Sequence, residues 1–250
     1  MKDLLPVYVV SVKKFTDRHL MIRRQATQFG LSIEFIWDFD VETMTPDDRA
    51  RCDQNVLPLK SMSCVLKHIE AQKRLLATEH DICLVLEDDA ILGAEFDRKL
   101  QNTLALAGKL EGPWLIFLGG MDNALDARFF ANQGPSLIES PLSTAEAYLI
   151  NREGCFERLA WLSDNLISKP ADHFLAYLDT MLSIPHYRVS LPFVTQGSIT
   201  GLFPTSLDSS RSNKPAWYLA LRYGWNRLRK QKLPIWFSRI RAQFVRILNK

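Results

Sequence analysis

The sequence lacks most features that mark secreted, membrane-spanning or zinc-binding proteins. Its 250 residues include four cysteines, and no two form a Cys-x-x-Cys pair, so we expect no zinc site, redox motif or cysteine nucleophile. No apolar run reaches the roughly 18 residues of a transmembrane helix. The start, MKDLLPVYVVSVKKF, lacks the basic and apolar regions of a signal peptide. We therefore expect a reduced protein that is cytoplasmic or faces the cytoplasm.

Glycine-rich nucleotide-binding motifs are also missing. The chain has neither Gly-x-Gly-x-x-Gly nor a P-loop, so neither a dinucleotide-binding fold nor a P-loop enzyme is supported. Internal repeats and low-complexity tracts are absent as well. With 47% hydrophobic and 24% charged residues, the composition is that of an ordinary globular protein with an ample core.

Acidic residues are absent from the last part of the chain. Residues 211–250 hold eleven Lys and Arg and no Asp or Glu, while the net charge of the whole chain is +3. Subtracting the +11 of this segment leaves −8 for the remainder. We therefore predict a domain over 1–210 and a basic tail over 211–250, which meet different partners.

Short apolar runs alternate with segments of helical spacing along most of the chain. Strands are expected at 7–12, 33–40, 82–86, 114–120, 145–150 and 187–191. Helices are expected at 17–29, 61–78, 96–109, 152–166 and 171–182. Residues 198–215 are expected to be a loop or linker. This alternation predicts an α/β fold with a central, mostly parallel sheet that helices cover on both faces.

One predicted strand ends in three adjacent carboxylates, Glu87, Asp88 and Asp89, within the segment ICLVLEDDAIL. A solvated turn is one explanation, because three neighbouring charges repel one another and are costly to bury. A bound cation is the other, because Mg²⁺ and Mn²⁺ prefer oxygen ligands. In an extended chain, Glu87 and Asp89 point to one side and Asp88 to the other, so two acids can share one site.

Further residues at strand ends favour the cation. Asp38 and Asp40 follow the second predicted strand, and Gly119 and Gly120 end the fourth. Ligands of open α/β sheets bind beyond the carboxyl ends of the strands. We therefore expect these residues to converge on the acid cluster.

Several blocks resemble those of a known family. They are VYVVSVKKFTDRHLMIRRQ, FIWDFDV, SMSCVLKHIEAQKRL and LVLEDDAIL, followed by STAEAYLINREG, KPADHFL and FVTQGSI. In this order they resemble glycosyltransferase family 25, which contains bacterial lipooligosaccharide β-galactosyltransferases and collagen-modifying relatives. Lys67 stands where the family usually has Ser, and Ser61 and Ser63 stand where it usually has Gly, whereas Cys64 and His68 are kept. These departures concern local acceptor or sugar contacts rather than the fold.

The resemblance implies a nucleotide-sugar-binding fold of the GT-A kind, a UDP-hexose donor, most often UDP-galactose, and inversion to a β-linkage. It also implies Mn²⁺ (or Mg²⁺), with Asp89 and Glu87 as metal ligands and Asp88 beside the donor. The family's Pro-x-Asp block falls on Asp172, which we expect to be the catalytic base. The helix dipole alone also favours an Asp in a first turn, and Asp172 is equally able to orient a sugar hydroxyl.

Six further residues are expected around the donor: Ser11, Arg18, Asp38, His68, Gln196 and Ser198. Arg18 is expected to reach a phosphate or to pair with Asp38, and Asp38 to bind the ribose or the base. The alternatives are a surface charge for Arg18 and a satisfied core histidine for His68. Tyr148 is expected in the core.

The tail interleaves Lys and Arg with aromatic residues, and Pro234 is expected to split it into two helices. This pattern is typical of helices that lie in a membrane interface, held by aromatic rings and by cations near anionic headgroups. Packing against the acidic body is the alternative. Nucleic acid is not expected as a partner, because no recognised nucleic-acid motif accompanies the charge.

We therefore expect an inverting hexosyltransferase that is peripheral on the inner face of the bacterial inner membrane. Its acceptor would be a lipid-linked oligosaccharide of the lipopolysaccharide or lipooligosaccharide core. The alternative is a catalytically silent nucleotide-sugar-binding or scaffolding protein at the membrane, although the intact acid cluster and Asp172 argue against it. A metal-dependent phosphohydrolase would need a second acidic cluster or a His pair, and the sequence offers neither clearly.

Overall fold

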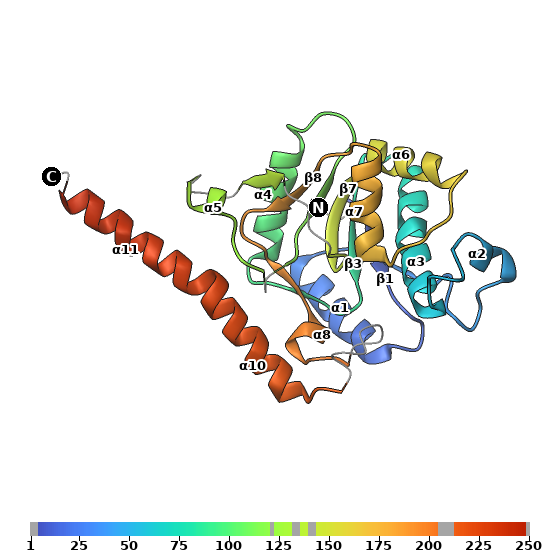
Figure 1. Ribbon diagram of the computed structural model, residues 1–250, viewed down its shortest axis with the longest axis horizontal. Coiled ribbons are helices and arrows are strands. Elements are labelled where there is room, and N and C mark those ends of the chain that lie inside the picture. The colour runs from blue at the N-terminus through green and yellow to red at the C-terminus, as the bar shows by residue number, and fades with distance from the viewer. Residues whose placement is uncertain (1–4, 121–122, 132–135, 140–143, 205–212, 249–250) are drawn as a thin grey trace.

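A seven-stranded sheet forms the centre of the protein (Figure 1). The computed structural model describes residues 5–120, 123–131, 136–139, 144–204 and 213–248. The strand order is β2-β1-β3-β7-β5-β8-β6. The strands are Val7–Val10 (β1), Ile33–Ile36 (β2), Ile82–Glu87 (β3), Leu115–Phe117 (β5), Leu137–Glu139 (β6), Ala147–Asn151 (β7) and His186–Val189 (β8).

Most strands of the sheet run in one direction. Strand β1 is parallel to both β2 and β3, and β5 is parallel to β8. Strand β7 is antiparallel to β3 and β5, and β6 is antiparallel to β8. The expected α/β fold with a mostly parallel sheet is thus confirmed, with two reversed strands. The expected strand at 33–40 is shorter, because Phe39 adopts a left-handed conformation (φ 59°) in a turn.

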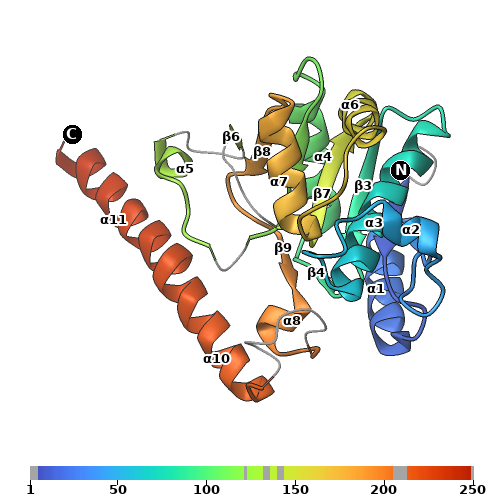
Figure 2. The same cartoon turned by 45° about the vertical axis from the view of Figure 1, so that its right-hand side comes forward.

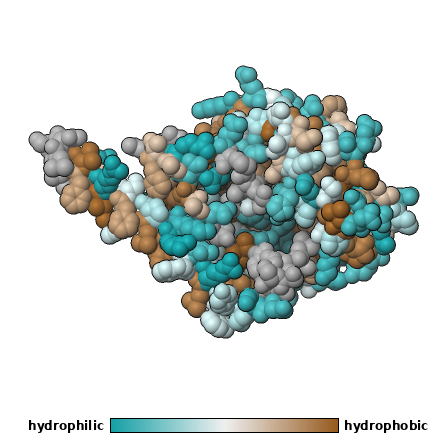
Figure 3. Space-filling model, viewed as in Figure 1, coloured by the Kyte–Doolittle hydropathy of each residue, from teal (hydrophilic) through white to brown (hydrophobic). Residues whose placement is uncertain are grey.

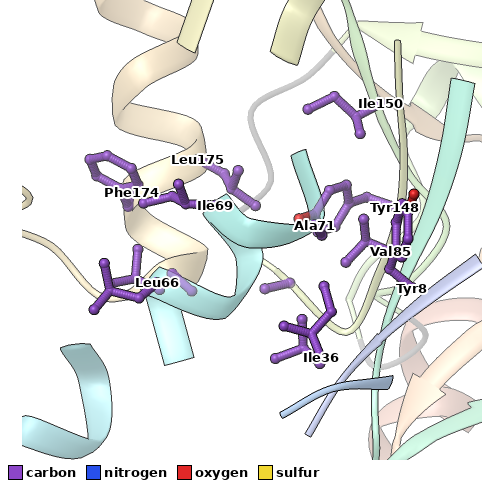
Figure 4. Close-up of a cluster of buried hydrophobic side chains, with 14 of the residues drawn as sticks. Tyr8, Ile36, Leu66, Ile69, Ala71, Val85, Tyr148, Ile150, Phe174 and Leu175 are labelled. Atoms are coloured by element: carbon purple, nitrogen blue, oxygen red, sulfur yellow. The ribbon is translucent and has the colours of Figure 1, made fainter. Parts of the chain in front are cut away.

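Helices cover both faces of the sheet. They are Thr16–Phe29 (α1), Pro46–Ala50 (α2), Leu59–Leu76 (α3), Phe96–Ala107 (α4), Ala127–Ala131 (α5), Arg152–Leu162 (α6) and Ala171–Met181 (α7). Alternate residues of β1 point to opposite faces of the sheet and enter different hydrophobic cores. Tyr8 and Val10 belong to one core, and Val7 and Val9 belong to the other. Figure 4 shows the first core, where Tyr8 and Tyr148 of the sheet lie near residues of α3 and α7.

A second, smaller sheet lies beside the carboxyl end of β3. Strand β4 (Ala90–Leu92) pairs antiparallel with β9 (Val194–Gln196), and Ala90 lies opposite Gln196. A short helix, α8 (Gly197–Thr200), follows directly within the segment expected to be a loop. A Cβ at Gly197 would lie 2.8 Å from the Phe203 ring and 3.0 Å from the Asp89 carbonyl oxygen, so this approach requires glycine.

The tail forms a helical rod that runs away from the sheet (Figures 1 and 2). It consists of α10 (Ala216–Arg227), a π-helical segment η1 (Leu228–Lys232) and α11 (Leu233–Leu248). The tail contains two α-helices as expected, and the second begins next to Pro234, but the π-helical segment joins them without a break. Pro234 lies in the first turn of α11, where its missing N–H is tolerated, and the π-helical segment directly before it changes the local hydrogen-bond pattern.

Candidate active site

The acid cluster lies where β3 ends, between the two sheets. Glu87 is the last residue of β3, and the chain turns at Asp88 and Asp89 into β4. Asp88 and Asp89 are buried, at 5% and 3% exposure, and Glu87 is half-buried. All three acids of the cluster therefore lie largely away from solvent, which argues against a solvated turn.

Both carboxylate oxygens of Asp88 accept hydrogen bonds, one from Ser11 directly after β1 and one from Arg18 of α1. The Ser11 hydroxyl donates to Oδ2 of Asp88 at 2.7 Å, and Arg18 Nη1 donates to Oδ1 at 2.8 Å. Since the only Ser11 proton goes to Asp88, Ser11 Oγ accepts from His19 Nε2, 2.7 Å away. Arg18 also donates to the Pro204 carbonyl at 2.6 Å. Arg18 is thus fixed beside the acid cluster.

The expected pairing of Arg18 with Asp38 is wrong. Asp38 instead accepts from Arg74 of α3 at 2.5 Å, and Arg74 also binds Glu34 of β2. Three acids, including Glu70, surround the Arg74 guanidinium, which draws Asp38 towards α3. Binding of ribose or base by Asp38 stays a prediction.

Asp40, which was expected near the acids, forms a buried ion pair with Lys67. The Lys67 ammonium lies 2.5 Å from Oδ1 of Asp40, and the side chain of Lys67 is 1% exposed. The backbone N–H of Lys13 donates to the second Asp40 oxygen at 3.0 Å. The departure from the family at Lys67 thus fixes the turn after β2, and Asp40 is not available as a metal ligand.

Glu87 and Asp89 are held by the segment that contains β9 and α8. Gln196 Nε2 donates to Oε2 of Glu87 at 2.9 Å. The backbone N–H of Ser198 donates to Oδ2 of Asp89 at 3.1 Å. The structure thus brings Gln196 and Ser198 to the acid cluster, through the Gln196 side chain and the Ser198 backbone.

Burial and mutual repulsion favour the protonated forms of these acids. Burial, with the nearby charges of Asp88 and Asp172, raises the pKa of Glu87 to about 7. Burial and the charge of Glu87 likewise raise the pKa of Asp89 to about 7. In the described part of the chain, neither carboxylate forms an ion pair with Lys or Arg.

His68 lies next to Glu87. Its Nδ1 lies 2.9 Å from the Tyr148 hydroxyl, and its Nε2 lies 3.6 Å from Oε1 of Glu87, which is too long for a hydrogen bond. Burial lowers the pKa of His68 to about 4, so its ring is neutral at pH 7. Tyr148 lies in the core as expected, and its hydroxyl also orients His68.

Asp172 lies in the first turn of α7, beside the same cluster. Its charge raises the pKa of Glu87 and of Cys64, so the carboxylate lies within electrostatic range of both. The side chain is half-buried, and Oδ1 accepts from the backbone N–H of His173 at 2.8 Å. Helix α7 therefore brings a fourth carboxylate to the end of β3.

Sequence reasoning missed Glu146, a buried acid just before β7. Its Oε1 accepts from the backbone N–H of Gly120 at 2.8 Å, and burial raises its pKa to about 7. A Cβ at Gly119 would overlap the Glu146 side chain, so glycine at this position leaves room for the carboxylate as it is placed here. The sequence signal is an acid within the otherwise buried run AEAYLI.

The residues fit a hard divalent cation. Glu87 and Asp89 offer carboxylate oxygens as ligands. Burial makes the ionised form of each carboxyl costly, and a bound cation would offset that cost. Asp88 is the exception, because Arg18 and Ser11 already bind both of its oxygens. The donor set therefore supports Glu87 and Asp89 as ligands, with Asp88 linking the cluster to Arg18.

A comparison with protein families identifies the N-terminal part of this site. Residues 4–111 match the model of glycosyltransferase family 25, described as an LPS biosynthesis protein, which confirms the resemblance over these residues. The match contains Ser11, Arg18, His68 and the acid cluster, and it supports a glycosyltransferase. Asp172, Gln196 and Ser198 lie beyond it. No curated protein matches the chain.

Proposed function

Because residues 4–111 match glycosyltransferase family 25, we propose that the chain is an inverting, metal-dependent hexosyltransferase. The proposed reaction moves galactose from UDP-galactose, with a β-linkage, onto a lipopolysaccharide or lipooligosaccharide core acceptor. A GT-A-like domain over 1–210 would carry the chemistry. The observation that carries the proposal is that the Glu87 and Asp89 carboxylates are buried together without a Lys or Arg ion-pair partner among the described residues.

Glu87 and Asp89 would hold Mn²⁺ or Mg²⁺. When bound, such an ion stabilises the negative charge of the leaving diphosphate as a Lewis acid. Gln196 and Ser198 support this role because their hydrogen bonds fix one oxygen of each carboxylate and leave the other for a ligand. Asp88 takes the supporting role of fixing Arg18.

Arg18 would supply positive charge near the donor phosphates. It is held by Asp88 and by the Pro204 carbonyl, and its guanidinium carbon lies 4.6 and 5.4 Å from the ring centroids of Phe15 and Phe203. A guanidinium fixed in this way loses little freedom when an anion binds. Ser11 and Asp38 complete the proposed donor contacts.

Asp172 is the proposed catalytic base. In a single inverting displacement, the acceptor oxygen bonds to the anomeric carbon while the bond from that carbon to the diphosphate breaks, and the acceptor proton passes to a base. Asp172 is suited to this task because its half-buried carboxylate lies at the edge of the acid cluster. General-base catalysis of this kind contributes about 10²–10⁴-fold.

The tail is proposed to bind an anionic membrane surface, which would hold the enzyme near a lipid-linked acceptor. Large apolar side chains along it are each more than half exposed: Trp217, Leu221, Trp225, Trp236, Phe237 and Phe244. Figure 3 shows hydrophobic and hydrophilic surface side by side along this rod. No helix in the described residues has the length and apolarity to span a bilayer. Of the eleven cations, Arg211 and Lys250 lie outside the described residues.

The body also contacts the tail. Gln231 of η1 donates to the Asn123 carbonyl at 2.9 Å, and Leu219 of α10 is buried. These contacts fix the near part of the rod, while α11 leaves most of its aromatic surface exposed. Partial packing and membrane binding are therefore compatible.

A nucleotide-sugar screen with and without Mn²⁺ tests the proposal. We expect a UDP-hexose to raise the melting temperature only when Mn²⁺ is present, and to be turned over with a core oligosaccharide acceptor. Stabilisation without turnover over a panel of acceptors would favour the silent binding or scaffolding protein. If no nucleotide sugar stabilises the protein, both functions are contradicted.

A further inference from the structure

Three side chains of different chemistry meet at one edge of the acid cluster. Cys64 and His68 lie four residues apart on α3, so they share one face of the helix. Glu87 reaches the same point from the end of β3. One ligand atom from each of the three residues lies within 4.8 Å of the other two.

The spacing is close to that of a metal site. A tetrahedral Zn²⁺ with bonds of about 2.0–2.3 Å holds its ligand atoms roughly 3.3–3.8 Å apart. The separation of 3.6 Å between His68 Nε2 and Glu87 Oε1 already lies in that range. A small movement of the Cys64 side chain would complete the triangle.

His68 is oriented as a metal ligand would be. Its side chain is 1% exposed, and its Nε2 is buried and makes no hydrogen bond in the described structure. Its Nδ1 lies 2.9 Å from the Tyr148 hydroxyl. When Nδ1–H donates to Tyr148, the lone pair of Nε2 faces Cys64 and Glu87. Histidines that bind metals are commonly oriented in this way, by a hydrogen bond to the ring nitrogen that does not bind the metal.

We propose that Cys64, His68 and Glu87 form a Zn²⁺ site that shares Glu87 with the proposed Mn²⁺ site. Thiolate and imidazole select Zn²⁺ over Mn²⁺, whereas the carboxylates of Glu87 and Asp89 suit Mn²⁺. On binding, a Zn–S bond forms and the Cys64 thiol proton leaves to solvent. Three protein ligands leave the fourth position open to water or substrate.

Sequence reasoning predicts no zinc site, because it looks for Cys-x-x-Cys pairs. The structure instead combines a Cys-x-x-x-His pair on a helix with a glutamate from a distant strand. The consequence, which rests on the proposed function, is that Zn²⁺ inhibits Mn²⁺-dependent sugar transfer because both ions use Glu87.

Cysteine footprinting on the wild-type protein tests the site without any sugar donor. Cys64 is half-buried, whereas Cys52, Cys83 and Cys155 are buried, so the Cys64 thiol is the most accessible of the four to an alkylating reagent. At a Zn²⁺ concentration 100 times the dissociation constant, we expect alkylation of Cys64 to slow about 100-fold. Mn²⁺ at the same concentration should leave the rate nearly unchanged. An equal rate with and without Zn²⁺ would overturn the proposal.

Cobalt substitution supplies a second readout. The wild-type protein and the control Cys52→Ala should both show a thiolate-to-Co²⁺ charge-transfer band, and Cys64→Ala should lose it. A wild-type Co²⁺ complex without that band, or a band that survives in Cys64→Ala, would contradict the assignment. If Cys64→Ala does not fold, the footprinting of the wild type decides alone. A negative result in either measurement contradicts the Zn²⁺ site but not the proposed transferase activity, because neither measurement involves a nucleotide sugar.

Discussion

The guanidinium of Arg18 donates to the Asp88 carboxylate at 2.8 Å, while the neighbouring acids Glu87 and Asp89 form no ion pair with Lys or Arg in the described part of the chain. The side chains of Arg18 and Asp88 are 11% and 7% exposed, so this is a buried ion pair. The cluster therefore contains one acid that Arg18 neutralises, Asp88, and two acids, Glu87 and Asp89, whose ionised forms a bound cation would stabilise.

Replacing Arg18 should destabilise the protein. Arg18→Gln leaves Asp88 buried without its cation, which costs roughly 3–5 kcal/mol of unfolding free energy. The control Arg24→Gln changes an exposed arginine on the same helix and should stay within about 0.5 kcal/mol of the wild type. Urea denaturation at pH 7 measures both, and equal midpoints for the two variants would contradict a structural role for the pair.

The raised pKa of Asp89 predicts how stability depends on pH. A carboxyl whose pKa rises from 3.8 to about 7 on folding holds its proton more tightly in the native state. It therefore stabilises the protein below its unfolded pKa, and this contribution is lost as the pH rises towards 7. Without metal, the stability of Asp89→Asn relative to the wild type should increase by a few kcal/mol between pH 4 and pH 8.

Thermal or urea unfolding across that pH range, with metal chelated, checks this difference. The control Asp97→Asn, which changes an exposed acid, should show no such trend. A stability difference for Asp89→Asn that is constant with pH would show that Asp89 ionises normally in the folded protein.

Asp172→Asn should slow sugar transfer by about 10²–10⁴-fold if Asp172 is the base. Stabilisation by the donor and Mn²⁺ should change little, because the residue acts on the acceptor side. His173→Gln is the matched control, since His173 is the next residue of the same helical turn and is exposed. Transfer by Asp172→Asn at the wild-type rate would remove Asp172 from the chemistry.

The tail should bind vesicles that contain anionic lipid. Each exposed arginine near such a surface contributes about 1 kcal/mol, so replacing Arg239, Arg241 and Arg246 with Gln should weaken binding by roughly 10²-fold. Activity on a water-soluble acceptor should remain. Vesicle sedimentation at low salt measures the change, and equal binding of the triple variant and the wild type would contradict the membrane role.

The main sheet is well predicted from the sequence because its strands are continuous apolar runs. VYVV and ICLVLE are inner strands of the sheet with helices on both faces, so their burial is visible in their composition. The pairing of β4 with β9 is not predictable in this way. It joins residues about one hundred positions apart, and each strand has only three residues.

The site is predicted less completely, because the partner of each acid depends on side-chain contacts between elements that are distant in the sequence. The acid cluster is visible as charge at the end of an apolar strand, but its division into Asp88 with Arg18 and Glu87 with Gln196 depends on how α1 and β9 pack. Asp38 follows its strand as expected, but it accepts from Arg74 in the last turn of α3, and the sequence does not give the position of that helix relative to β2.

Titration of Mn²⁺ followed by electron paramagnetic resonance tests the central proposal most directly, because it counts free and bound ion with and without UDP. At pH 7.5 we predict one Mn²⁺ bound per wild-type chain in the presence of UDP, and an affinity lower by about 10²-fold in Asp89→Asn, with Asp97→Asn unchanged. Equal affinities for the wild type and Asp89→Asn would mean that the ion, if bound, lies elsewhere than at the end of β3.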